Sequence, residues 1–89
     1  ARKMIWKRKD VLLSDIEKII LGNMSKKLKY IARDEDGALY VFEYKPKKGK
    51  ASWYDGNTLY RLDFYNHLFD FIKWEDSEPY LINDLVSRD

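Results

Sequence analysis

The sequence predicts an α+β domain in which an antiparallel meander of about four strands is covered by an N-terminal helix and by a short helical C-terminal segment. Three observations predict this class: one helix start signal, two glycine-containing turns that each join β-rich runs, and an aromatic C-terminal stretch. The 89 residues allow one hydrophobic core. We therefore expect a single domain over residues 1–89, with residues 1–10 as a flexible basic arm.

The first element is a helix predicted over residues 14–21. Ser14 and Glu17 form the S-x-x-E pattern of a capping box, in which each side chain accepts a hydrogen bond from a backbone N–H of the first turn. A Gly-Asn pair directly after the helix is a typical stop signal. Apolar residues at i, i+3 and i+4 spacing predict one buried stripe. Its members are Ile16, Ile19 and Ile20.

A β-hairpin is predicted next, from residues 28–33 and 38–45. The acidic turn 34–37 ends in Asp-Gly, which favours a tight chain reversal because glycine readily takes a positive φ. The second run, ALYVFEY, is apolar on both faces except at Glu43, as expected of a central strand covered on both sides. Residues 47–50, directly after Pro46, are expected to form a loop.

A second hairpin is predicted from residues 52–54 and 59–62 through the Asp-Gly-Asn turn at 55–57, which completes four strands paired in chain order. Residues 64–69 are then expected to form a short helix that leads into a short strand. The competing interpretation is a fifth strand, FDFIKW, over residues 69–74. Ser-Glu-Pro at 77–79 resembles a further helix start. The apolar residues of the C-terminal turns that cover the core are Leu81, Ile82 and Leu85.

The sequence predicts no catalytic residue, no metal site and no cofactor, so we expect a protein that is not an enzyme. Cysteine is absent, and the single histidine, His67, is interpreted as a polar residue on the outer side of a short segment. The acidic turn at 34–37 is too short for a calcium-binding loop. The acidic residues at 75, 76 and 78 are expected to be solvated, and no serine lies in a G-x-S-x-G motif.

The two halves of the chain carry opposite charge. Residues 1–50 contain 14 Lys and Arg against 7 Asp and Glu, whereas residues 51–89 contain 3 against 8. If the fold separates the halves, one face attracts acidic partners; if strands of both halves are neighbours, the charges largely neutralise one another. No apolar run approaches the length of a membrane span, so a soluble, cytosolic protein without a membrane partner is expected.

Basic and aromatic residues alternate in three segments, which is typical of surfaces that combine phosphate contacts with stacking platforms. The alternative interpretation is that the rings cover the core while lysines extend over them. The nucleic-acid-binding candidates are Lys7, Arg8, Lys9, Lys26, Lys27, Lys29, Lys47, Lys48 and Lys50. Exposed tyrosine and tryptophan would equally suit a protein partner. The protein-binding candidates are Trp53, Tyr54, Tyr60 and Trp74.

Two stretches, KKLKYIARDEDGALYVFEYKPKKGKASWYDG and FDFIKWEDSEPYLINDLV, resemble small hypothetical proteins encoded in phages and prophages of low-GC Gram-positive bacteria. The resemblance covers about residues 26–86, and residues 1–23 depart from the shorter versions by an extra arm and helix. The resemblance implies a phage-borne accessory protein that acts in the cytoplasm of a bacterial host. It implies no catalytic residue.

The leading functional hypothesis is therefore a binding module that modulates a host or phage protein. The alternative is a nucleic-acid-binding protein that uses the basic and aromatic segments. A third hypothesis is a homo-oligomer in which an exposed edge strand, Ser52–Tyr54, pairs with its copy.

Overall fold

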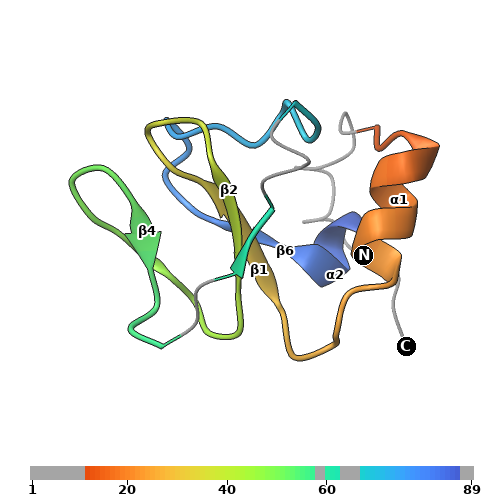
Figure 1. The fold of residues 1–89 in the computed structure, drawn as a ribbon, viewed down its shortest axis with the longest axis horizontal. Helices are drawn as coiled ribbons and strands as arrows, with labels where there is room; N and C mark the ends of the chain where they lie inside the picture. The colour runs from red at the N-terminus through yellow and green to blue at the C-terminus, as the bar shows by residue number, and fades with distance from the viewer. Residues whose placement is uncertain (1–11, 58–59, 63–66, 87–89) are drawn as a thin grey trace, which may run out of the picture.

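The structure, a computed structural model, describes residues 12–57, 60–62 and 67–86. Helix α1 (Asp15–Gly22) is followed by a four-stranded antiparallel sheet in the order β5-β2-β1-β6, and by the short helix α2 (Ile82–Leu85) (Figure 1). The strands of this sheet are β1 (Tyr30–Arg33), β2 (Leu39–Phe42), β5 (Tyr60–Arg61) and β6 (Tyr80–Leu81). A second, two-stranded sheet pairs β3 (Lys47–Lys48) with β4 (Trp53–Tyr54). The predicted α+β class is confirmed.

The first predicted hairpin forms the centre of the sheet. Strands β1 and β2 pair in a register that runs from Tyr30 opposite Phe42 to Arg33 opposite Leu39. The backbone N–H of Asp34 donates to the Ala38 carbonyl at 2.8 Å, and Gly37 takes a φ of 95° in the turn. A side chain at that position would strain the backbone, so the Asp-Gly signal in the sequence is confirmed.

The second predicted hairpin is wrong, because β4 pairs with β3 and β5 pairs with β2. Residues 47–48, expected in a loop, therefore form a strand. The chain reverses earlier than predicted, where the N–H of Gly49 donates to the Ser52 carbonyl at 2.7 Å. The Asp-Gly-Asn sequence makes only a local turn, in which the Asp55 carboxylate accepts from the N–H of Asn57 at 2.9 Å. The sheet is thus not a meander in simple chain order.

The segment before β6 also differs from the prediction. The expected helix over 64–69 falls partly outside the described residues, and residues 67–79 form turns and irregular backbone rather than a strand over 69–74. Ser77–Pro79 does not start a helix, because β6 intervenes and α2 begins only at Ile82. Strand β6 pairs with β1, with Leu81 opposite Tyr30, so it occupies the free edge of the central hairpin.

The core lies on both faces of the sheet. On one face Leu21 of α1, Ile31 of β1, Ile82 of α2 and the turn residue Phe69 form a buried cluster. On the other face Ala32 and Phe42 pack against Trp53 of β4. Figure 1 shows the same layers, with the sheet between α1 and α2 on one side and β4 on the other. The prediction of a central strand covered on both sides is therefore confirmed for β2.

The predicted buried stripe of α1 is wrong for Ile16 and Ile19, whereas Ile20 is half-buried and packs against the core cluster. Ile16 and Ile19 are 52% and 62% exposed, whereas Leu21 is buried completely and Glu17 is 9% exposed. The capping box itself is confirmed, since Ser14 and Glu17 exchange both expected hydrogen bonds. The second oxygen of the Glu17 carboxylate accepts from the N–H of Phe69 at 2.6 Å. This bond turns the capping side of the helix inward and leaves Ile16 and Ile19 outside.

The oppositely charged halves of the chain are interleaved rather than separated. Strands β1 and β2 come from the basic half, and they are flanked by β5 and β6 from the acidic half. An ion pair of 3.1 Å between Lys45 and Glu78 also joins the halves. Of the two arrangements considered from the sequence, the structure therefore has the one in which strands of both halves are neighbours.

Candidate functional site

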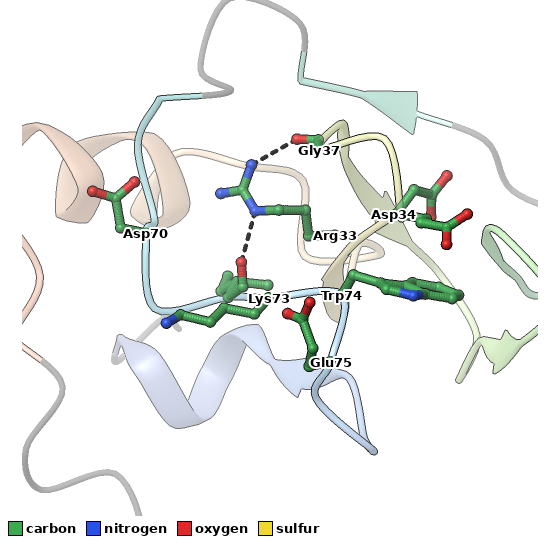
Figure 2. A pocket seen from close by; sticks show the side chains of 9 residues that line it. Arg33, Asp34, Gly37, Asp70, Lys73, Trp74 and Glu75 are labelled. Atoms are coloured by element: carbon green, nitrogen blue, oxygen red, sulfur yellow. Dashed lines mark hydrogen bonds between the residues drawn. The ribbon is translucent and has the colours of Figure 1, made fainter.

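A pocket of about 260 Å³ opens where β1 ends. It is lined by the last residue of β1, by the turn 34–37 and by residues 70–75, and so it lies between the central hairpin and the irregular segment that precedes β6 (Figure 2). Ligand pockets for whole small molecules usually enclose roughly 300–1,000 Å³, so this pocket is smaller than that range.

The guanidinium group of Arg33 lies at the centre of the pocket wall and binds backbone carbonyls. Its Nε donates to Ile72 at 2.6 Å, and its Nη1 donates to Gly37 at 2.7 Å. Its Nη2 donates to Leu68 at 2.8 Å and to Phe69 at 3.0 Å. Burial lowers the pKa of Arg33, and the charge of Asp70 opposes that effect. Arg33 therefore fixes the irregular segment to the sheet.

Two charged side chains hold the backbone of Phe69 where the irregular segment meets the sheet. Its backbone has a φ of 58°, in the left-handed region that non-glycine residues rarely adopt, and its side chain is fully buried. The Glu17 carboxylate accepts from its N–H, and Arg33 donates to its carbonyl. A left-handed residue costs roughly 1–2 kcal/mol, so these two charged side chains stabilise a conformation that the backbone alone disfavours.

The carboxylates around the pocket do not converge on one point. Figure 2 shows Asp34 and Asp70 on opposite sides of Arg33. Asp34 is 7% exposed, and its Oδ1 accepts from the N–H of Trp53 at 2.9 Å. Burial raises the pKa of Asp34, while the bond to Trp53 acts in the opposite direction. Among residues 12–57, 60–62 and 67–86, no three His, Cys, Asp or Glu side chains are grouped to hold a metal ion. Arg33 and Asp34, which line this pocket, therefore connect structural elements to one another through their hydrogen bonds.

Two of the four predicted protein-binding residues belong to the packing of the molecule. Trp53 is only 4% exposed, and it meets Trp74 edge-to-face with ring centroids 6.5 Å apart. The ammonium group of Lys48 lies 4.3 Å from the Trp74 ring centroid and donates to the carbonyls of Trp74 and Asp76. We therefore correct the expectation for Trp53, which is a core residue: its ring fills the space between the sheet and β4.

The other two predicted residues are exposed tyrosines. Tyr54 is 54% exposed and Tyr60 is 52% exposed, and a third ring that the sequence did not indicate, Tyr44, is 56% exposed. A hydrogen bond joins the segments of Tyr44 and Tyr54, since the N–H of Tyr44 donates to the Asp55 carboxylate beside Tyr54 at 3.3 Å. We call Tyr44 and Tyr54 the tyrosine face; Tyr60 lies opposite Val41 of β2, so its side chain is on the sheet face that Val41 and Ile31 share, away from β4. Tyr44 continues the apolar run of β2 in the sequence and is exposed because that strand ends at Phe42.

The predicted nucleic-acid-binding residues fall into separate groups. Lys26, Lys27 and Lys29 are exposed in the loop between α1 and β1. Another group, in the β3–β4 hairpin, consists of Lys47, Lys48 and Lys50. Figure 1 shows these loops apart, one below the sheet and one at its left. The remaining candidates, Lys7, Arg8 and Lys9, lie outside the described residues. In the described part of the chain, the lysines are not gathered on one loop.

The remaining polar candidates are close to their predicted positions. His67 is exposed, as interpreted from the sequence. Of the acidic residues at 75, 76 and 78, Glu75 is exposed and Glu78 pairs with Lys45, whereas the Asp76 carboxylate is half-buried and accepts from the N–H of Lys73 at 2.9 Å.

Comparison with known proteins shows no relative of this chain. No protein-family model matches the sequence, and neither the curated proteins nor the solved structures contain a significant match. The resemblance to phage-encoded proteins therefore stays a prediction. None of the described helices has the length and apolar character needed to cross a bilayer.

Proposed function

We propose that this chain is a non-catalytic protein-binding module and that its contact surface is the tyrosine face. The observation that carries the proposal is the exposure of Tyr44 and Tyr54, each more than half accessible, with their segments bonded to one another. Tyrosine offers a large contact area and a hydroxyl group at low cost in side-chain entropy, and it is enriched among the residues that dominate binding energy. In the phage setting that the sequence suggests, the partner is a host or phage protein.

The surroundings of Tyr54 support a preformed surface. Its neighbour Trp53 is buried, so alternation along β4 directs Tyr54 outward. The Tyr54 ring also packs closely over Gly49, where an added Cβ would lie 3.2 Å from the ring. A ring held in place before binding loses less entropy on binding, which favours affinity.

A nucleic-acid partner is the less favoured alternative. One of the exposed candidate lysines, Lys48, is engaged with two carbonyls and two indole rings. Phosphate binding by the chain would rely on the remaining lysines of the two separate loops, and its affinity would fall steeply with salt.

Site-specific photo-crosslinking in bacterial lysate tests the proposal. A photoreactive phenylalanine analogue is placed at Tyr44 or Tyr54, and at Lys26 as a control on another exposed loop. We expect one protein to be crosslinked from both tyrosine positions and not from position 26. Tyr44→Ala and Tyr54→Ala should each weaken binding of that protein by roughly 10-fold or more. Crosslinks to nucleic acid, equal crosslinking from all positions, or unchanged binding of both variants would overturn the proposal.

A further inference from the structure

Helix α1 presents apolar side chains to two sides. Leu21 points into the core, whereas Ile16 and Ile19 are 52% and 62% exposed. Residues three apart in a helix lie on the same side, so the two isoleucines form one outward stripe. Leu12, two residues before the N-cap, is 89% exposed. A surface helix of a monomer normally has polar residues on its outer side.

The charges beside the stripe are self-complementary. Asp15 and Lys18 are both exposed, and at about 100° of rotation per residue they both lie on the same side of the stripe, one negative and one positive. In two antiparallel copies of α1 related by a two-fold axis near residues 17 and 18, Ile16 of each copy faces Ile19 of the partner subunit. The same operation brings Asp15 within one helical turn of Lys18 of the partner subunit, so this ion pair forms twice.

A hollow beside the helix completes the match. It encloses about 380 Å³ and is lined by Lys18, Gly22, Leu85 and Val86. A Cβ added at Gly22 would meet no atom within 4 Å, so this part of the helix surface is open. In the antiparallel arrangement, Leu12 of one copy comes close to the level of Gly22 of the partner subunit.

We propose that α1 forms the interface of a symmetric homodimer in which the two α1 helices pack antiparallel. Ile16 packs on Ile19 of the partner subunit, Asp15 pairs with Lys18 of the partner subunit, and Leu12 covers the partner's hollow. The inference goes beyond the proposed binding function, because it uses α1 and leaves the tyrosine face of each copy free. Two short helices bury less than the roughly 1,200–2,000 Å² that is typical of stable interfaces, so the dimer is weak and depends on concentration.

Sedimentation velocity of the full chain over a range of concentrations measures this equilibrium. Ile16→Lys and Ile19→Lys each place two buried charges in the symmetric interface, and we expect each to raise the dimer dissociation constant by roughly 100-fold. Tyr54→Lys is the matched control on the tyrosine face and should leave the constant unchanged. Because Ile16 and Ile19 are exposed, circular dichroism should show an unchanged monomer fold.

A charge exchange provides the second, independent test. Asp15→Lys and Lys18→Asp create like-charge contacts across the two-fold axis, and each should weaken the dimer by about 5- to 10-fold. The double variant restores opposite charges and should return to within about 3-fold of the original. A chain that stays monomeric up to about 1 mM, above the range of ordinary weak interfaces, would overturn the proposal. So would a dimer insensitive to Ile16→Lys, sensitive to Tyr54→Lys, or not restored by the double exchange.

Discussion

Arg33 and Lys48 hold the same irregular segment to the rest of the molecule, but in different surroundings. Arg33, half-buried at the end of β1, donates to four carbonyls of residues 37 and 68–72. Lys48, exposed on β3, donates to the carbonyls of Trp74 and Asp76 and lies over two indole rings. Both cations come from the basic half of the chain, and both bind backbone of the acidic half.

The two cations differ in how easily water can take their place as hydrogen-bond donor to the backbone carbonyls. Residues 67–79 form no regular strand or helix, so their carbonyls have no ladder partners. The Phe69 carbonyl accepts from the N–H of Ile72 in a turn, whereas those of Leu68 and Ile72 accept from Arg33. The hydrogen bonds of Lys48 are exposed to water, whereas those of Arg33 are partly buried. The same kind of contact therefore contributes much more to stability at Arg33 than at Lys48.

Arg33→Leu is expected to have the largest effect. It removes donors from four carbonyls at once, and we expect the free energy of unfolding to fall by about 3–5 kcal/mol. Urea denaturation followed by tryptophan fluorescence measures this change. Arg33→Lys keeps the charge but not the planar set of donors, and should lose a smaller part of the stability. A loss below about 1 kcal/mol in Arg33→Leu would contradict the role assigned to the guanidinium.

Glu17→Ala tests the anionic counterpart of Arg33 at Phe69. The substitution leaves the N–H of Phe69 buried without its acceptor and removes half of the capping box, so a loss of about 2–3 kcal/mol is expected. Ser14→Ala is the matched control, because it disturbs only the cap and should lose about 1 kcal/mol. Equal losses in the two variants in urea denaturation would show that the Phe69 bond contributes nothing.

Lys48→Met should have a smaller effect, of about 0.5–1 kcal/mol, because solvent screens the exposed ammonium and replaces its hydrogen bonds. Lys47→Met is the control, because alternation along β3 directs this exposed neighbour to the opposite face, and it should change stability by less than about 0.3 kcal/mol. Thermal denaturation distinguishes the two. A loss of stability in Lys48→Met as large as that in Arg33→Leu would contradict the difference between the contacts of the two cations.

Asp34→Asn is expected to show the smallest effect, and that effect depends on pH. Burial raises the pKa of Asp34 above its ordinary value of 3.8, so the folded state binds the proton more tightly than the unfolded state. The stability contributed by the protonated form is present below pH 3.8 and is lost as the pH rises through the folded pKa. Urea midpoints measured from about pH 3 upward should therefore fall less in Asp34→Asn than in the original protein. Parallel curves for the two proteins would be the contrary result.

Local signals in the sequence predicted the parts of the fold that depend on neighbouring residues. The capping box of Ser14 and Glu17 and the Asp-Gly turn after β1 both occur as predicted, because their hydrogen bonds form within a few residues. The pairing of β5 with β2 was not predictable in this way. It depends on where the chain reverses at Gly49, which resembles an ordinary loop glycine in the sequence.

The candidate site was predictable only in part. Trp53 and Tyr54 alternate along a two-residue strand, so one ring had to face inward, but nothing in the sequence indicates which one. Likewise Glu17 reads as a capping residue, and its contact with Phe69, 52 positions away, decides which side of α1 is buried. Long-range contacts of single charged side chains have no periodic signature.

The order of strands also has a consequence for synthesis. The central hairpin of β1 and β2 consists of neighbouring residues, but the partner of β1 on its other side is β6, about 50 positions later, where Leu81 lies opposite Tyr30. A chain emerging from the ribosome therefore carries β1 with one edge unpaired until almost all of the residues described have left the tunnel. During that interval this edge is available to other extended chains, so the nascent protein is more prone to aggregation than the finished one.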